Sequence, residues 1–159
     1  MNRRGQTSYT SGYNIDRWIN HNADSTVSIT SSGLTIKNNI ESATFIFDQR
    51  CDFMAELQGK QVTYSFLVAD VTGEVAVQCG GGAFWISKPG LHSGTVNSFN
   101  GSNIDYLLRM FKTATNTSIT LVGAKVELGD TQTLAHQDSN GNWVLNEIPK
   151  YSEELLKCR

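Results

Sequence analysis

Hydrophobic and polar residues alternate in short runs along most of the chain, and groups of polar turn residues separate the runs. Alternation over four to eight residues is typical of β-strands with one buried face. The clearest run spans residues 60–70, in which every second residue from 62 to 68 is hydrophobic and Thr63 and Ser65 lie between them. We therefore predict a long strand here that places one face in the core.

Shorter runs predict further strands, at residues 26–30, 34–37, 43–48, 74–78, 83–88, 95–98 and 143–145. The turn residues 31–33 predict a hairpin between the first two of them, and the triglycine at 80–82 predicts a tight connection between strands. Residues 104–112 are hydrophobic on both faces and fit either a buried strand or a helix. The remainder of 89–101 and all of 131–142 are predicted to be loops.

The run at residues 119–128 changes its hydrophobic face in the middle. Hydrophobic residues occupy odd positions at 119 and 121 and even positions from 124 to 128. A strand keeps one face inward through such a change only if an extra residue corrects the register. We therefore predict a β-bulge near Val122 and Gly123.

Two short helices complete the predicted elements. Residues 52–57 have hydrophobic residues at helical spacing, and Gly59 follows as a terminator. Near the C-terminus, Tyr151, Leu155 and Cys158 lie on one face of a possible helix.

Eight to ten short strands with tight turns indicate an all-β, antiparallel β-sandwich in a single domain. Within this domain we assign residues 1–20 to an N-terminal arm that packs on the sandwich, and residues 21–130 to the sandwich core. Residues 131–159 are assigned to a C-terminal loop and short helix.

The composition agrees with a turn-rich β protein and excludes several other classes. Ser, Thr, Asn and Gly number 57, about twice the 28 charged residues, whereas helical bundles are rich in Ala, Glu, Lys and Leu. No hydrophobic run approaches the ~20 residues of a membrane helix, and residues 1–14 lack the apolar segment of a signal peptide. The net charge is −2 and basic residues are scattered, so we expect cytoplasmic synthesis and no nucleic-acid or membrane partner.

No residue pattern points to catalysis or to a metal. Cys51, Cys79 and Cys158 are widely spaced, and we expect buried, reduced thiols. The chain lacks nucleophile-elbow, phosphate-loop and dinucleotide motifs, and no carboxylate pair has aromatic subsites beside it. We therefore expect a protein that is not an enzyme and that needs no metal or cofactor.

Motifs near both ends of the chain resemble a known family. Residues 2–18 contain Asn-x-Arg-Gly and Tyr-x-x-Asp-Arg-Trp, residues 124–133 contain Lys-x-Glu-Leu-Gly-x-x-x-Thr, and residues 149–159 close on Glu-Leu-x-Lys-Cys. Together these motifs resemble the jelly-roll domain near the C-terminus of many tailed-phage and prophage tail-fibre or baseplate proteins. The middle of the chain matches that family only in its strand rhythm.

The resemblance implies a jelly roll, similar to carbohydrate-binding modules, that serves virion structure or attachment to a host-surface glycan. It also implies a location in the virion tail, other tail or fibre subunits as partners, and a homo-oligomer, with a trimer expected by analogy. An alternative is a carbohydrate-binding module of a secreted glycan-degrading enzyme. A third hypothesis, an esterase or lyase on a β scaffold, has no motif to support it.

Trp85 is the best candidate for a ligand contact. It follows Phe84 in a predicted strand, so if the Phe84 ring lies in the core, the indole points outward. An exposed indole can stack on a sugar ring while polar side chains bind the hydroxyl groups. The segment after Trp85 offers such side chains, namely His92, Asn97, Asn100 and Asn103. The competing interpretation is that Trp85 packs under this segment or in a subunit interface.

Asp16, Arg17 and Trp18 are interpreted as a structural anchor. The indole would fill one end of the core, and the two charged side chains would fasten the N-terminal arm by hydrogen bonds. The competing interpretation is that Trp18 forms a stacking platform for a sugar.

Overall fold

The computed structural model describes residues 8–9, 12–13, 18–21, 25–39, 45–49, 54–101, 106–112 and 116–146. In these residues the chain is all-β with antiparallel pairing, apart from one helical turn, α1 (Met54–Leu57). None of the helical structure described is long and apolar enough to cross a membrane. The predicted all-β antiparallel class is confirmed for this part of the chain.

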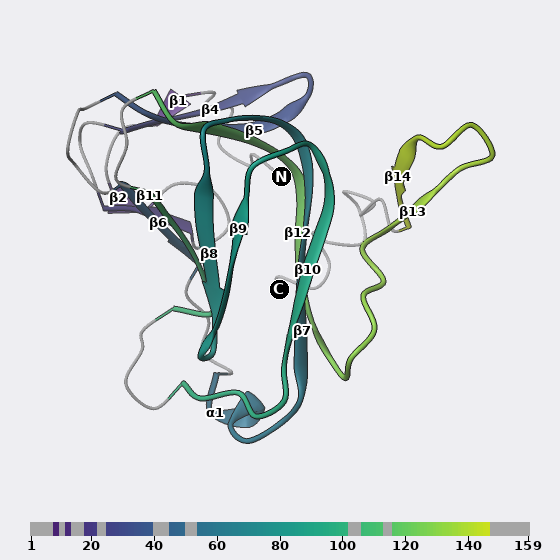
Figure 1. The fold of residues 1–159 in the computed structure, drawn as a ribbon. Coiled ribbons are helices and arrows are strands. Elements are labelled where there is room, and N and C mark those ends of the chain that lie inside the picture. The colour runs from purple at the N-terminus through teal and green to yellow at the C-terminus, as the bar shows by residue number, and fades with distance from the viewer. Residues whose placement is uncertain are drawn as a thin grey trace, which may run out of the picture.

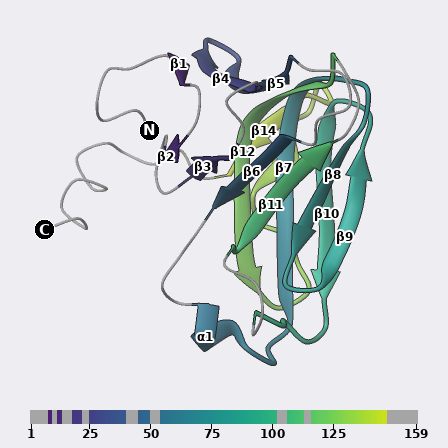
Figure 2. The ribbon, with the colours of Figure 1, turned by 90° about the vertical axis from the view of Figure 1, so that its left-hand side faces the viewer.

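Two sheets pack face to face as a sandwich (Figures 1 and 2). Sheet A runs, edge to edge, through β1 (Ser8–Tyr9), β4 (Ser25–Thr30), β5 (Gly33–Asn38), β12 (Ser118–Leu128), β7 (Val62–Thr72) and β10 (Gly90–Val96). Sheet B runs through β2 (Gly12–Tyr13), β3 (Trp18–Asn20), β6 (Phe45–Gln49), β11 (Leu108–Lys112), β8 (Val75–Cys79) and β9 (Gly82–Ile86).

A separate two-stranded sheet, β13 (Ala135–Gln137) with β14 (Trp143–Leu145), extends away from the sandwich, and we call it the projecting hairpin (Figure 1). It follows β12 and rests on the outer face of sheet A, where Leu134, Ala135 and Leu145 pack against Leu67 and Leu91. This hydrophobic cluster is separate from the main core.

The chain crosses between the two sheets at most of the connections after β6, so both sheets contribute to one core. The inward-facing residues of β7 and β8 are almost fully buried, among them Val62, Phe66, Val75 and Val77. Burying one such side chain contributes roughly 1.5–3 kcal/mol. The alternation of hydrophobic and polar residues in the sequence therefore determines which face of each strand is buried.

Several predicted elements are confirmed. The hairpin at residues 31–33 exists as β4 and β5, with Thr30 opposite Gly33. The predicted helical turn is α1. The triglycine joins β8 to β9 through Gly80 and Gly81, whose positive φ angles of 49° and 100° suit a two-residue hairpin turn.

The predicted bulge in the last long strand is also confirmed. The register of β12 against β7 shifts between Thr120 and Leu121 and again between Leu121 and Gly123. These shifts allow Leu121 before the bulge and Val126 after it to pack on the same core.

The prediction that 89–101 is mainly loop is wrong, because residues 90–96 form strand β10, which pairs with β7 over seven residues. The misleading signal was Gly94, which has a packing role. A Cβ at this position would lie 2.9 Å from Cδ1 of Phe84 and 3.0 Å from Cζ of Tyr64. Glycine in a strand interior can mark such a close approach rather than a loop.

Other expectations have mixed outcomes. The predicted loop 131–142 contains strand β13. The ambiguous segment 104–112 ends in strand β11, which lies between β6 and β8. The predicted C-terminal helix lies outside the described residues.

Candidate functional site

Polar side chains meet on the outer face of sheet B, the face turned away from the core. Strand register places Asp48 of β6 opposite Arg109 of β11, and Arg109 opposite Gln78 of β8. Their side chains point outward, because the neighbouring residues along each strand are buried in the core. One row across three strands therefore carries a carboxylate, a guanidinium and an amide.

The carboxylate of Asp48 is fully engaged. Arg109 donates from Nε to Oδ1 and from Nη2 to Oδ2, both over 2.7 Å. Nε2 of His21 lies 3.0 Å from the same Oδ2, and the Asp48 side chain is completely buried. Bidentate pairing of this kind fixes both groups in one geometry, which suits a structural role for Asp48.

Tyr106 covers the guanidinium of Arg109. The guanidinium carbon lies 3.8 Å from the centroid of the Tyr106 ring, a cation–π distance. The Tyr106 hydroxyl donates to Oε1 of Gln78 over 3.1 Å. This end of the outer face is therefore closed, since Ile19, Asp48 and Tyr106 are buried although their positions lie outside the core.

The other end of the same face is open at Trp85. The indole lies on edge strand β9 opposite Ala76 and is 56% exposed. Its ring centroid is 6.4 Å from that of Phe111, with the planes tilted by 59°. Trp85 and Phe111 thus form an aromatic row beside the polar row of Gln78 and Arg109, and the small, exposed Ala83 leaves space next to the indole.

The structure places Trp85 apart from the polar partners expected for it. His92 lies on β10 in sheet A, where its Nε2 is 2.8 Å from the carbonyl oxygen of Lys88. Asn97 follows β10 and accepts from Gln61 over 3.1 Å. Asn100 donates its backbone N–H to the carbonyl oxygen of Gly80, just beyond the far end of β8 and about 10 Å or more from Trp85 along the strands.

Asn103 lies outside the described residues. Of the expected ligand contacts, Trp85 alone is found on the outer face of sheet B in the part of the chain that the structure describes. The polar and aromatic side chains that share this face with it include Gln78, Arg109 and Phe111.

The anchor motif is described only at its last residue. Trp18 is 8% exposed and stacks on Phe47, with ring centroids 4.7 Å apart and planes within 9°. The indole therefore packs in the core. Asp16 and Arg17 lie outside the described residues.

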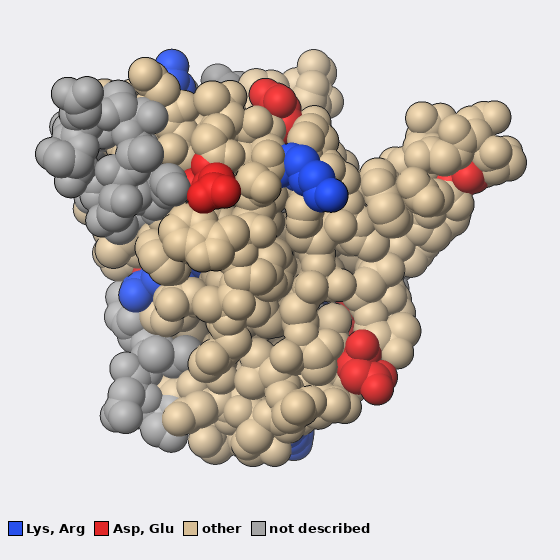
Figure 3. Space-filling view, in the orientation of Figure 1, with Lys and Arg blue, Asp and Glu red and all other residues tan. Residues whose placement is uncertain are grey.

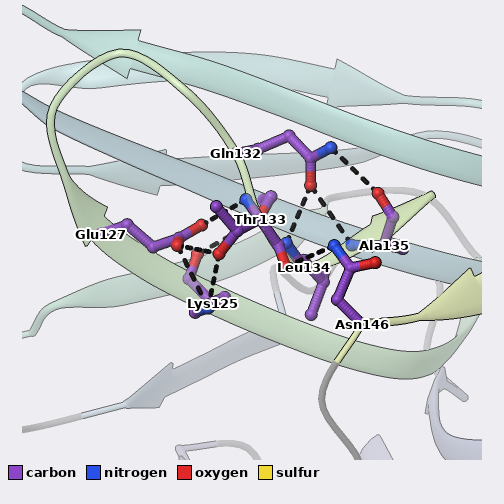
Figure 4. A network of polar contacts seen from close by, with 8 residues as sticks. Lys125, Glu127, Gln132, Thr133, Leu134, Ala135 and Asn146 are labelled. Atoms are coloured by element: carbon purple, nitrogen blue, oxygen red, sulfur yellow. Dashed lines mark hydrogen bonds and ion pairs between the residues drawn. The ribbon is translucent and has the colours of Figure 1, made fainter.

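The Lys-x-Glu-Leu-Gly-x-x-x-Thr motif forms a second polar network, on the outer face of sheet A (Figure 4). Thr133 donates its N–H to Oε2 of Glu127 over 2.8 Å and its hydroxyl to Oε1 of the same residue. Lys125 donates to the Thr133 hydroxyl oxygen over 2.6 Å and pairs with Glu127 over 3.1 Å. The motif thus ties the segment after β12 back onto β12.

The same network continues into the base of the projecting hairpin (Figure 4). Oε1 of Gln132 accepts from the N–H groups of Leu134 and Ala135, over 2.9 and 3.3 Å. Asn146 donates from Nδ2 to the Thr133 carbonyl over 2.8 Å. These bonds satisfy backbone groups where the hairpin leaves the sandwich.

Two carboxylates in this region have lowered pKa values. Burial alone would raise the pKa of Glu127, but hydrogen bonds from Thr133 and Lys125 and the charge of Lys125 bring the pKa below its ordinary value. At the tip of the hairpin, hydrogen bonds from the backbone N–H groups of Asn142 and Asn140 lower the pKa of Asp138.

The sequence contains a weak signal for the polar row on sheet B, which lies in its charged residues and not in the alternation of hydrophobic residues. Asp48 and Arg109 are charged residues of opposite sign that follow hydrophobic residues within their strands. Charges at such positions are usually paired. The sequence does not show which strands become neighbours, so the pairing itself needed the structure.

Within the described residues, no group of His, Cys, Asp and Glu side chains is arranged to hold a metal ion. No protein-family model matches the chain, and no curated protein matches its sequence. The function is therefore inferred from the site, the fold and the sequence motifs.

Proposed function

We propose that this chain is a non-enzymatic jelly-roll domain of a phage or prophage tail, which helps to build the virion and binds a host-surface glycan at Trp85. The sandwich with its crossing connections supports the jelly-roll part of the proposal. The motifs that resemble tail proteins support the tail location, and the network around Glu127 gives one of them a structural role.

The exposure of Trp85 carries the proposal of glycan binding. An indole that is 56% exposed on the face of a sheet, with Phe111 behind it, offers a flat apolar surface. The C–H face of a pyranose ring stacks on such a surface, while neighbouring polar groups bind its hydroxyls. Gln78 shares the face and lies diagonally across from Trp85 in the register.

The state of Asp48 favours binding over catalysis. It is the carboxylate of the polar row next to Trp85, and a glycosidase would need such a group as an acid or base. Both of its oxygens accept hydrogen bonds from Arg109, and the side chain has no exposure. A carboxylate so engaged stabilises the sheet face instead of transferring protons.

A glycan array that includes host cell-surface polysaccharides tests this proposal. The array is probed with the natural chain, Trp85→Ala and Trp143→Ala. Trp143 is the matched control, since it is a second exposed indole, 39% exposed, on the projecting hairpin. We expect Trp85→Ala to weaken binding by roughly tenfold or more, equivalent to about 1.4 kcal/mol, and Trp143→Ala to bind like the natural chain.

Circular dichroism and a thermal melt confirm that each variant is folded. Absence of binding by the natural chain to every glycan would overturn the proposed binding function. If folded Trp85→Ala binds the glycan as well as the natural chain does, the binding site does not lie at Trp85 on sheet B.

A further inference from the structure

The two sides of the sandwich end in very different edge strands. On one side the sheets end in β1 and β2, of two residues each. On the other side they end in β9, of five residues, and β10, of seven, whereas only the two residues named for β1 and for β2 are described. An edge strand exposes unpaired backbone groups, and short edge strands are one way in which proteins prevent pairing with other chains.

Strand β10 is a regular edge. All seven residues pair with β7 in one continuous register, from Gly90 opposite Val68 to Val96 opposite Val62, without a bulge. In an antiparallel ladder, every second residue directs its N–H and C=O away from its partner strand. Within the described part of the chain, the backbone of residues 90–96 makes no hydrogen bond beyond this ladder.

Three common protections of an edge strand, namely lysine, proline and a bulge, are missing from β9 and β10. Lysine, proline or a bulge commonly blocks pairing, yet neither β9 nor β10 contains a charged residue or proline. Lys88 is the single charged residue in the 30 residues from 75 to 104, where the overall charged fraction of 18% would give about five. Figure 3 looks onto this side of the molecule, and charged side chains are scattered singly, mostly at its margins.

Two exposed tryptophans flank this edge. Trp85 lies on β9, on the outer face of sheet B. Trp143 reaches β10 from the projecting hairpin, because its Nε1 would lie 3.3 Å from a Cβ on Gly90. Tryptophan is enriched among the residues that carry most of the binding energy in protein interfaces.

We infer that β10 pairs antiparallel with β10 of a second copy of this chain, which joins the two copies of sheet A across a two-fold axis. A two-fold axis at Ser93 places Ser93 opposite its own copy, Leu91 opposite Thr95 and Gly90 opposite Val96. No like charges oppose each other in this register. A two-fold interface needs a self-complementary surface, and an uncharged regular strand meets that need.

This inference does not depend on glycan binding, and it gives a dimer where the resemblance led us to expect a trimer. A strand from an unrelated chain could occupy the same edge, but it would not produce the self-contact of Ser93. A Ser93 self-contact, if it is found in the test below, therefore distinguishes a second copy of this chain from any other strand.

A single substitution to cysteine at the axis provides the direct test. Residues directly opposite in an antiparallel pair have Cα atoms about 4.5–5.5 Å apart, within the range that a disulfide spans. Under mild oxidation we expect Ser93→Cys to form a covalent dimer, whose peptide map links position 93 of one copy to position 93 of the other. Thr26→Cys is the matched control, exposed on β4 at the opposite side of sheet A, with the same natural cysteines, and should not form this dimer.

Light scattering after size exclusion completes the test. We expect the natural chain and Thr26→Lys to give a dimer that dissociates on dilution, and folded Ser93→Lys to give a monomer at every concentration. A monomer or a trimer from the natural chain would overturn the inference. A dimer that persists in Ser93→Lys would also overturn the inference. The same holds if Ser93→Cys forms no disulfide between the two copies.

Discussion

Asp48 is a charged side chain that strand register places outside the core and that is still completely buried. The Asp48 carboxylate is stabilised in this buried position by two hydrogen bonds from Arg109 and by His21, whose Nε2 lies 3.0 Å from Oδ2. The attraction within such a buried pair roughly offsets the cost of removing both charges from water. Removing one partner alone is costly, because the other charge is left without compensation.

We therefore expect Asp48→Ala to lower the free energy of unfolding by about 3 kcal/mol, at the lower end of the range for breaking a buried pair. The Arg109 side chain is 24% exposed, so water can compensate it in part. Urea denaturation followed by tryptophan fluorescence measures the loss. Asp70→Ala, at an exposed position on β7, should change stability by less than about 0.5 kcal/mol. A loss of similar size in the two variants would contradict a structural role for the pair.

Only part of the site around Trp85 could be predicted from individual residues in the sequence. The alternation of Phe84 and Trp85 correctly predicts one ring inside and one outside, because side chains in a strand alternate between faces. The polar neighbours of Trp85 could not be predicted in the same way. Asp48 and Arg109 are 61 residues apart in the chain, and only the order of β6, β11 and β8 in sheet B brings them to one face.

At the scale of elements, the projecting hairpin depends on the network around Glu127. The folded pKa of Glu127 is lower than its ordinary value. A carboxylate with a lowered folded pKa contributes stability above its unfolded pKa and loses that contribution as pH falls through the folded pKa. The base of the hairpin should therefore loosen in acid, once the pH falls below the ordinary pKa of glutamate and through the lower folded pKa of Glu127.

Amide spectra recorded between pH 7 and pH 2 measure this loosening. We expect the Thr133 N–H resonance, which reports its bond to Glu127, to shift as the carboxylate gains a proton. Asp138 at the hairpin tip also has a lowered pKa, so Glu127→Gln serves as the control that isolates the base. A Thr133 shift that persists unchanged in Glu127→Gln would show that another group titrates.

Strands and bulges could be predicted where the pattern of hydrophobic residues along the chain alone specifies them. The change of hydrophobic parity within 119–128 required a bulge, and β12 has one. The full extent of strand β10 could not be predicted, because its two loop-like signals, Gly90 at its start and Gly94 inside it, are glycines that avoid contacts with side chains from other elements. Such contacts exist only after the sheets have packed.

At the scale of the whole molecule, sequence-distant strands are neighbours. In sheet A, β12 lies between β5 and β7, and Ile36 pairs with Ile119. In sheet B, β11 joins β6 to β8. The chain must close long loops before these pairs form, and proteins dominated by such pairing fold slowly.

We therefore expect refolding in milliseconds to seconds after dilution from urea, as for other sandwiches of non-local strand pairing. Stopped-flow tryptophan fluorescence would follow it, since Trp18 stacks on Phe47 only when β3 and β6 have paired. Complete recovery of the signal within microseconds would contradict this expectation.

The turn at the tip of the projecting hairpin has a consequence for how such a protein can diversify. Its hydrogen bonds are local, from Asn140 and Asn142 to Asp138 and from Gln137 to Gly141. The hydrophobic cluster and the Glu127 network lie at the hairpin's base, away from the tip. Insertions at 139–141 would leave the sandwich intact, as exposed loop tips tolerate them best. At this turn, inserted residues or a grafted peptide can therefore be accommodated without a change in the fold of the sandwich.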